Sequence, residues 1–398
     1  MIRKSMMICG VILVFVSVGC GYEKEPLPTL EPDHRAVLRA WLDDNGAPPE
    51  QYILSKFTDH DIVFLGEYHR IRHDVILVQN MIPILHRNGI FNLGLEFLRN
   101  VDQDEIDNLL SAETYDETLA NSLFWNEWPF WGYKEYIDIL RVAWRFNRDL
   151  PPDIRRFRIV GLNARMDWSH VWSNEDRASP ELMSLVFPDG NPDEVMAGTI
   201  VHEILNKNEK ALIYSGINHA YTKFKQPVLD PATNELVRHN STRMGNRIYD
   251  KIADRCCTIF LHSPWPASTG YGDPDVYPAD GIIDALFKDM SPGKRRIGFD
   301  VKNSPFGELN ARTALWSHSK QDFRLKDFCD GWIYQMPLSL YRGVSVIPDW
   351  FNKENRLQAI AQIANADPAV KNTDRSVSDL MNIMASDTDF EWRFSRFQ

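Results

Sequence analysis

Short apolar, β-rich runs alternate along the chain with segments whose apolar residues recur at helical spacing. The runs predict strands at 62–65, 91–97, 158–162, 211–214 and 258–261, with weaker candidates at 297–301 and 332–334. Helices are predicted between them at 74–87, 135–146, 194–205 and 242–253. Strand, helix and strand in repeated order predict an α/β protein with a mostly parallel sheet flanked by helices.

The first predicted helix contains two residues that bear on its shape. Gly89 follows the apolar pattern directly and is placed to end the helix. Pro83 lies inside the pattern and should kink the helix, because proline lacks a backbone N–H and crowds the preceding turn.

Two stretches interrupt the alternation of strands and helices. Residues 102–132 are first acidic and then aromatic, and predict a helical, aromatic-rich insertion. Residues 264–292 are rich in Pro, Gly, Asp and Tyr, and predict a long loop of the kind that serves as a lid or binding loop. The sequence has no internal repeat and no clear domain boundary, so residues 34–398 are predicted to form one domain.

The N-terminal residues are predicted to be a signal peptide. Two basic residues precede an apolar stretch at 6–18 that is too short to span a bilayer. Residues 17–20, Ser-Val-Gly-Cys, resemble the lipobox of bacterial lipoproteins, which implies removal of residues 1–19 and lipidation of Cys20. The protein is then expected in the cell envelope, anchored to a bacterial membrane and facing the periplasm or cell surface. Ordinary secretion with cleavage nearby is the alternative, and the proline-rich residues 20–33 predict an extended tether.

The mature chain keeps three of the five cysteines: Cys256, Cys257 and Cys329. Adjacent cysteines seldom bond to each other because the geometry is strained. Either one of them pairs with Cys329, or all three are buried thiols. No Cys-x-x-Cys spacing supports a zinc knuckle.

Composition narrows the range of partners. The chain carries a formal net charge of −11 and has no basic block of five or more residues, which argues against a nucleic-acid partner. Hydrophobic residues at 44% and charged residues at 25% are typical of a globular protein. The 12 tryptophans indicate a large core with aromatic-lined clefts.

Ligand-capable side chains follow the C-terminal ends of consecutive predicted strands. Glu67 and His69 follow the first strand, Glu96 ends the second, and His219 follows the fourth. The same ends also carry Asn163, Arg165, Asp167 and His262. In an open parallel sheet, ligands bind at the carboxyl edge. The sequence therefore predicts one site there, with Glu67, His69, Glu96 and His219 as its catalytic or metal-binding residues.

The neighbours of this set have alternative roles. Glu96 follows an apolar run, so a buried carboxylate there needs a partner. Either Glu96 forms a salt bridge with Arg70 or Arg99, or it serves as a metal ligand or general base. Substrate binding is predicted for Arg70, Asn163, Arg165 and Asp167, with the arginines holding an anionic group. Supporting positions behind the site are predicted for His73 and His262.

These residues carry a resemblance to a known superfamily. Residues 62–69, Ile-Val-Phe-Leu-Gly-Glu-Tyr-His, followed by His73 and a helix, resemble the opening motif of the ChaN-like haem-binding lipoproteins. Erythromycin esterases and Tiki/TraB proteases are similar more remotely. The superfamily has two Gly-x-x-His motifs and a Glu after the second strand, which match 66–69, 216–219 and Glu96. The match runs in order from 60 to 225.

The resemblance implies several activities. Tiki-type members are metal-dependent proteases, erythromycin esterases use a His near the first motif to activate water, and ChaN-like members bind haem for iron uptake. We expect first a hydrolase of a small-molecule or peptide substrate, in which the two Glu and two His act on water or hold Mn²⁺, Co²⁺ or Zn²⁺. The alternative is a haem-binding lipoprotein in which Tyr68 and the histidines supply axial ligands. A third is a non-catalytic surface protein.

Overall fold

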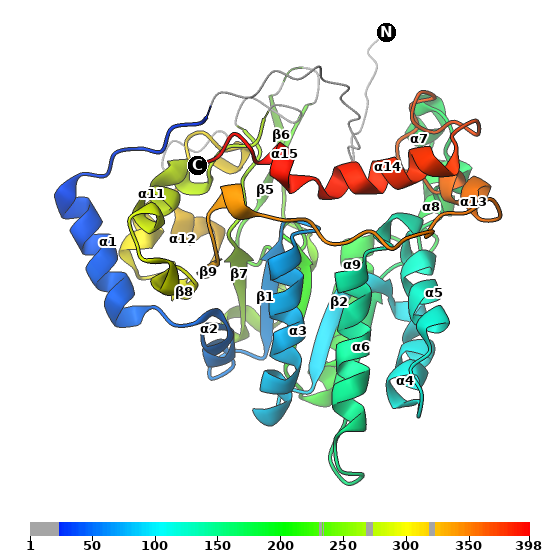
Figure 1. Ribbon diagram of the computed structural model, residues 1–398, viewed down its shortest axis with the longest axis horizontal. Coiled ribbons are helices and arrows are strands. Elements are labelled where there is room, and N and C mark those ends of the chain that lie inside the picture. Colours follow the sequence, from blue (N-terminus) through cyan, green and yellow to red (C-terminus); the bar gives the residue numbers. More distant parts are fainter. Residues whose placement is uncertain (1–23, 231–232, 234, 268–273, 318–322) are drawn as a thin grey trace.

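The computed structural model describes residues 24–230, 233, 235–267, 274–317 and 323–398 (Figure 1). Its centre is a seven-stranded sheet in the order β3-β2-β4-β1-β7-β9-β8. All neighbours are parallel except β8, which runs antiparallel to β9. The strands are β1 Ile62–Glu67, β2 Asn92–Arg99, β3 Arg158–Asn163, β4 Ala211–Gly216, β7 Cys256–Leu261, β8 Ile297–Asp300 and β9 Gly331–Tyr334. The predicted α/β class and all seven predicted strands are confirmed.

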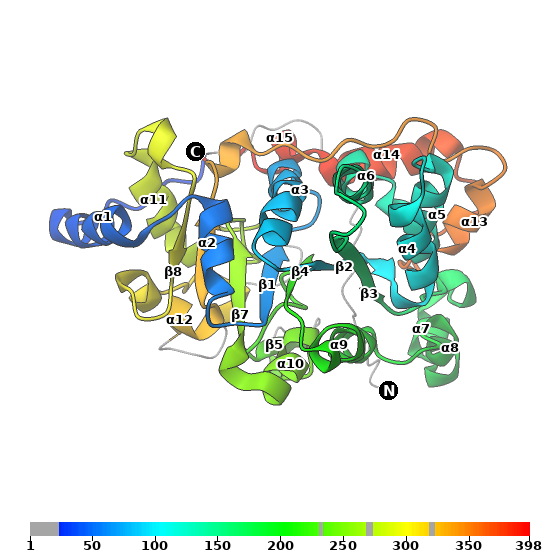
Figure 2. The ribbon, with the colours of Figure 1, turned by 90° about the horizontal axis from the view of Figure 1, so that it is seen from below.

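Helices cover both faces of the sheet (Figure 2). Helices α3 and α6 pack on one face, and α9 and α10 pack on the other. The main helices are α1 Pro32–Asn45, α2 Pro49–Lys56, α3 Arg72–Arg87, α4 Gln103–Ser111, α5 Glu117–Glu127, α6 Lys134–Arg148, α7 Asn174–Ala178, α8 Pro180–Val186, α9 Pro192–Glu203 and α10 Met244–Ile252. The C-terminal third adds α11 Ile282–Lys288, α12 Leu325–Phe328, α13 Arg356–Ala361, α14 Val377–Thr388 and α15 Phe390–Arg393.

The apolar runs of the sequence reflect this two-sided covering. Along β1, Val63 and Leu65 point into one hydrophobic core, and Ile62 and Phe64 point into the other. Successive side chains of a strand face opposite sides, so a strand covered on both faces must be apolar at every position. This explains why the runs predicted strands well.

The structure shows the surroundings of both residues singled out in the first predicted helix, α3. Gly89 adopts a left-handed backbone with φ +77 just after the helix, as expected of a helix-ending glycine. The helix continues through Pro83 from Arg72 to Arg87 as one element. Its apolar side is buried along its whole length, from Val75 to Leu85, which holds the chain helical on both sides of the proline.

The two interrupting stretches both contain helices. The insertion at 102–132 holds α4, α5 and a 3₁₀ turn at Pro129–Trp131, which confirms its helical, aromatic character. The stretch at 264–292 was predicted to be a long loop, but α11 lies inside it and buries Ile283 and Leu286. A helix of seven residues is too short to show a clear helical period. A two-stranded hairpin, β5 Gln226–Leu229 and β6 Leu236–Asn240, was not predicted.

The first described residues pack against the domain. Lys24 Nζ donates to the carbonyl oxygen of Ser395 at 2.7 Å, and Glu25 N donates to that of Arg396 at 2.8 Å. Leu30 is buried. From Lys24 onward the segment is therefore docked, instead of forming the extended tether that was predicted. The signal peptide and Cys20 lie outside the described residues.

Two further findings bear on the sequence predictions. Cys256, Cys257 and Cys329 are free and buried, so the three residues are buried thiols and no bond joins them. Within the described ranges, no helix is long and apolar enough to cross a membrane.

Candidate functional site

Glu67 and His69 form a hydrogen-bonded pair at the carboxyl end of β1. Glu67 Oε1 lies 2.8 Å from His69 Nδ1 and accepts a hydrogen bond from the Tyr136 hydroxyl at 2.6 Å. The Tyr214 hydroxyl donates to the other carboxylate oxygen. With Nδ1 donating to Glu67, the lone pair of His69 lies on Nε2, where it can accept a proton.

The surroundings of Glu67 hold its carboxyl group still. Burial raises the pKa of Glu67, while the hydrogen bonds from His69 and Tyr136 oppose that shift. The Tyr136 hydroxyl accepts from the backbone N–H of Arg70 at 2.9 Å, so its own proton is directed at Glu67. Glu67 thus serves to orient His69.

Aromatic rings hold the other side of His69. Its ring centroid lies 5.7 Å from that of Phe97 and 5.3 Å from that of Trp131, both edge to face. The His69 side chain is 34% exposed, so its free edge remains reachable from solvent. Trp131 comes from the predicted aromatic insertion, which therefore supplies a wall of the site.

Gly216, at the end of β4, allows His69 to approach the backbone closely. A Cβ at position 216 would lie 2.8 Å from His69 Nε2 and 3.5 Å from Glu96 Oε2. No side chain fits there without displacing the imidazole. His69 of the first Gly-x-x-His motif and Glu96 therefore both lie next to Gly216, the glycine of the second motif.

Glu96 and His219 form a second pair beside the first. Glu96 Oε2 accepts a hydrogen bond from Gly216 N at 2.6 Å, and its Oε1 lies 3.3 Å from His219 Nε2. His219 Nδ1 lies 2.7 Å from Asp193 Oδ1, and Arg243 Nη1 donates to Asp193 Oδ2 at 3.1 Å. The four residues predicted at the strand ends therefore do meet at one edge of the sheet.

The charges around His219 keep it protonated. Burial lowers the pKa of His219, but the charges of Glu96 and Asp193 outweigh burial and raise it to about 9. Burial raises the pKa of Asp193, but His219 and Arg243 outweigh it and lower the value to about 2. At neutral pH His219 is an imidazolium between two carboxylates, so it is a poor general base.

Two acidic residues of the site were missed by sequence reasoning. Asp193 lies in the first turn of α9, where an acidic residue is ordinary, so nothing marked it. Glu127 is the last residue of α5 and lies inside the aromatic run at 124–131. A charged residue within such a run was the one sign in the sequence that it belongs to a site. Its Oε1 accepts from Asn163 Nδ2 at 2.9 Å, and its buried Oε2 has no partner among the described residues. Burial, followed by the charge of Glu96, raises its pKa to about 8.

The arginines predicted to bind an anion are engaged elsewhere. Arg165 Nε donates to Asp189 Oδ2 at 3.0 Å on the surface. Arg70 Nη2 lies 3.5 Å from Asp387 Oδ2, and the Arg70 guanidinium packs over Trp131. Both guanidinium groups are therefore paired with acids of the same chain.

Arg99 and Asp167 also have partners away from the proposed ligand. Arg99 pairs with Asp102 at 2.6 Å, so neither salt bridge considered for Glu96 forms. Asp167 accepts from Ser169 N at 3.0 Å and Gln362 Nε2 at 2.8 Å. Its carboxylate therefore organises the loop after β3.

His73 and His262 belong to buried polar pairs next to the site. His73 Nε2 lies 3.4 Å from Asp74 Oδ1, and burial lowers the pKa of His73 to about 3. His262 Nε2 lies 3.0 Å from Asp284 Oδ1. Burial, followed by the charge of Glu67, raises the pKa of Asp74, so Asp74 lies close enough to the Glu67–His69 pair to interact with its charge.

The residues predicted as metal ligands do not form a metal centre. Within the described part of the chain, no three His, Cys, Asp or Glu side chains are grouped so that they could hold a metal ion. The physical reason is that the donor atoms face one another. Both oxygens of Glu67 accept hydrogen bonds, and both ring nitrogens of His219 lie against carboxylates. The donor set does not fit a divalent metal ion.

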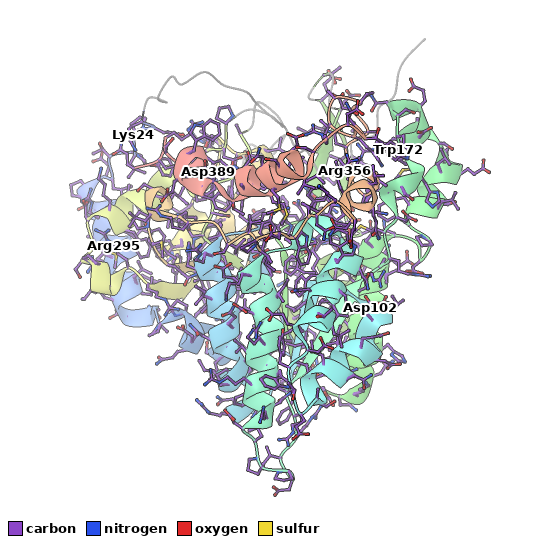
Figure 3. The ribbon with its side chains drawn as sticks, turned by 45° about the vertical axis from the view of Figure 1, so that its right-hand side comes forward. Lys24, Asp102, Trp172, Arg295, Arg356 and Asp389 are labelled. Atoms are coloured by element: carbon purple, nitrogen blue, oxygen red, sulfur yellow. The ribbon has the colours of Figure 1, made fainter. Side chains whose placement is uncertain are left out.

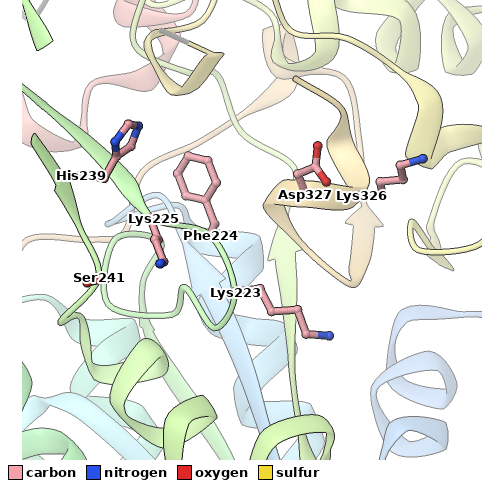
Figure 4. Close-up of a pocket in the computed structure, with 7 residues that line it drawn as sticks. All are labelled: Lys223, Phe224, Lys225, His239, Ser241, Lys326 and Asp327. Carbon is pink, nitrogen blue, oxygen red and sulfur yellow. The ribbon is translucent and has the colours of Figure 1, made fainter. Parts of the chain in front are cut away.

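A hollow of about 640 Å³ lies apart from these residues (Figure 4). It is lined by Lys223, Phe224, Lys225, His239, Ser241, Lys326 and Asp327. Lys223 pairs with Asp254 at 3.1 Å, and Lys326 pairs with Glu308. Much of its positive charge is therefore neutralised, and none of the predicted site residues lines it.

Comparisons with known proteins agree with the resemblance found in the sequence. The family described as "Haem-binding uptake, Tiki superfamily, ChaN" matches residues 53–179, which confirms that resemblance. A comparison with curated proteins gives no match.

Several solved structures are similar to this chain. A Bacillus cereus protein is 13% identical, covers 75% of this chain and 96% of its own, and has a TM-score of 0.45. A mutant erythromycin esterase in its open conformation is 11% identical, covering 76% of this chain and 95% of its own, at a TM-score of 0.49. Campylobacter jejuni ChaN, solved with cofacial haem, is 19% identical, covering 57% of this chain and 88% of its own, at 0.35.

Proposed function

Starting from this superfamily resemblance, we propose that the chain is a hydrolase of ester or lactone bonds in which His69 is the general base. The observation that carries the proposal is the Glu67–His69 pair. Nδ1 of His69 is committed to a buried carboxylate, and the ring, whose Nε2 faces Gly216, keeps 34% of its side chain exposed beside aromatic walls. A carboxylate that fixes the tautomer and orientation of an imidazole is the arrangement that general-base catalysis needs.

The proposed reaction is a water attack on the substrate carbonyl. His69 Nε2 takes a proton from water while the water oxygen bonds to the carbonyl carbon, which gives a tetrahedral intermediate. Glu67 stabilises the imidazolium that forms. The bond to the leaving oxygen then breaks, and His69 returns the proton to that oxygen. Atoms and charge balance with water as the only co-reactant.

Glu96, His219 and Asp193 act as a positioning unit in this proposal. Glu96 accepts the hydrogen bond of Gly216 N, and Gly216 is the backbone point against which the His69 ring packs. The imidazolium of His219 neutralises Glu96 and is itself held by Asp193. Fixed charges of this kind hold the base within the small tolerance that catalysis allows.

The test is a screen of esters, lactones and peptides with the full chain, followed by substitution. We expect His69→Ala to lower kcat/KM by about 10²–10⁴-fold on the best substrate, because the general base is lost. His202→Ala is the control, since His202 lies on α9 with its side chain 79% exposed. Full activity of the His69→Ala protein would refute the proposal.

Haem binding is the second candidate, supported by the family match at 53–179. His69 offers one imidazole nitrogen beside two aromatic rings, which suits an axial ligand. Tyr68 does not fit the ligand role predicted for it, because its hydroxyl donates to Asp275 Oδ2 at 3.3 Å. A hemin titration followed by visible absorption decides: a Soret shift in the wild type that is absent in His69→Ala would support this role over hydrolysis.

We further propose that Cys20 is lipidated and anchors the protein in the cell envelope. The support is the sequence at 17–20 after an apolar segment. Mass spectrometry of the protein from membranes is expected to show an acylated N-terminal Cys20, and Cys20→Ser should remove the protein from the membrane fraction. An unmodified Cys20 would refute this.

A further inference from the structure

The two ends of the described chain are joined. Lys24 Nζ donates to the carbonyl oxygens of Ser395 at 2.7 Å and Phe397 at 3.2 Å. Glu25 N donates to Arg396 O, and the Arg396 and Glu25 side chains form an ion pair. The first described residue, Lys24, therefore lies beside the C-terminus.

The C-terminal segment lies across the carboxyl edge of the sheet, where the Glu67–His69 pair is found (Figure 1). Tyr68, between the two, packs against Phe390 at 5.9 Å and Phe394 at 5.8 Å between ring centroids. Figure 3 shows Lys24 and Asp389 along the same edge of the molecule as α14 and α15, far from Asp102. The exit of the N-terminal segment and the site thus share one face.

The length of the connection limits how far this face can stand from an anchor. Lys24 lies four positions after Cys20, and extended chain spans at most about 3.6 Å per residue. An acyl group on Cys20 therefore keeps Lys24 within roughly 14 Å of the lipid. The part of the surface around Lys24 therefore stays close to the membrane.

The same segment exposes large apolar side chains. Leu340, in a 3₁₀ turn at Leu338–Leu340, is 54% exposed, and Trp392 on α15 is 49% exposed. Tryptophan is favoured at the boundary between lipid and water, where its ring is apolar and its N–H meets polar groups. These side chains suit contact with a bilayer surface.

The charges of this segment are largely paired with one another. Arg342 pairs with Glu391, Arg396 with Glu25, and Arg70 with Asp387. Binding to anionic lipids relies on clusters of unpaired Lys and Arg. The paired charges therefore favour contact through the acyl anchor and apolar side chains, with little dependence on lipid charge.

We propose that the face formed by residues 24–27, 338–342 and 386–398 lies on the surface of the lipid bilayer in the acylated protein. It follows that the Glu67–His69 pair meets substrates held at the membrane surface, such as amphipathic esters. The orientation rests on the proposed lipidation of Cys20. Only the statement about substrates rests on the proposed hydrolase function.

The test compares labels at two exposed apolar positions of full-length acylated protein. Leu340→Cys places a thiol on the proposed face. Ile154→Cys is the matched control. Ile154 is 40% exposed and belongs to the connection between α6 and β3, and Figure 1 shows that connection at the end of the molecule opposite α14 and α15. Each variant is labelled with an environment-sensitive fluorophore and reconstituted into phosphatidylcholine vesicles with and without nitroxide-bearing lipid. The parent protein, whose three thiols are buried, serves as the blank.

We expect nitroxide lipid to quench the label at position 340 several-fold more than the label at 154, at both about 0.1 M and about 1 M salt. Equal quenching at the two positions, or stronger quenching at 154, would overturn the proposal. So would the absence of an acyl group on Cys20 in the purified protein. Because quenching needs no catalysis, a correctly oriented but inactive protein would count against the hydrolase function alone.

Discussion

At the scale of single residues, the site depends on a glycine that makes room for an imidazole. Gly216→Ala would place a Cβ 2.7 Å from His69 Cε1, closer than carbon atoms approach. We expect kcat to fall by about 10²-fold, because displacing a catalytic group by about 1 Å has effects of that size. Activity is measured beside the Gly198→Ala control, whose new Cβ would meet no atom within 4 Å. Equal activity of the two variants would show that His69 tolerates the displacement.

His219 should make stability depend on alkaline pH. Its pKa is raised to about 9 in the folded state from an ordinary 6.5, so the stabilisation is complete below pH 6.5 and is lost as pH rises through 9. His219→Gln also leaves Glu96 without its charged partner and Asp193 with Arg243 alone. We expect the free energy of unfolding at pH 6 to drop by about 3 kcal/mol. Urea titrations across pH should show this gap narrowing between about pH 6.5 and pH 9, and a constant gap would contradict the assignment.

Glu127 should also make stability fall as pH rises, over a lower pH range. Its pKa is raised to about 8 from 4.5, so the folded state holds a proton that the unfolded state releases, and stability falls as pH rises between these values. Glu127→Gln keeps the acceptor for Asn163 and cannot ionise. We expect the variant to be about 1–3 kcal/mol more stable than the parent at pH 8, and equal at pH 4. Exposed Glu113→Gln is the control, and a parallel pH dependence in all three proteins would refute the prediction.

Residues at the ends of strands were predictable, and residues brought in by helices were not. Glu67, His69, Glu96 and His219 are found from the sequence because parallel strands all end at one edge. Asp193 and Glu127 reach the same edge from α9 and α5. Their positions depend on how each helix packs over the sheet, and the helical period alone does not contain that information.

At the scale of elements, the aromatic insertion supplies Trp131 as a wall for His69. Trp131→Phe keeps an aromatic ring and is expected to retain most activity, whereas Trp131→Ala should lower kcat/KM by about tenfold or more, because the imidazole loses one support. Trp172→Ala, on a 38% exposed surface residue, is the control. Thermal melts of each variant separate loss of folding from loss of activity. Unchanged activity in folded Trp131→Ala would assign the insertion a purely structural role.

Strands of the central sheet could be predicted because burial on both faces makes them apolar throughout. The β5–β6 hairpin could not, because β6 is largely exposed and carries Arg238 and His239 among its few residues. Helix α11 was taken for part of a loop because it has only seven residues. Short elements are stabilised by the packing around them, so their own sequences contain little periodicity.

At the scale of the whole molecule, the α/β class was predictable and the course of the chain ends was not. Residues 24–31 contain prolines that favour extended backbone, which led to the prediction of a tether. The segment instead docks on Ser395 and Arg396, which lie more than 370 positions later in the sequence. Contacts at that separation leave no mark in a local pattern.

The bonding between Glu25 and Arg396 also determines where mechanical load enters the protein. A force that pulls on the N-terminal segment acts on its contacts with the C-terminal segment, residues 386–398, as well as on the chain that follows. In the C-terminal segment, Phe390 and Phe394 pack on Tyr68, the neighbour of His69. A force on the N-terminal segment would therefore strain a set of contacts that reaches the residue next to the imidazole.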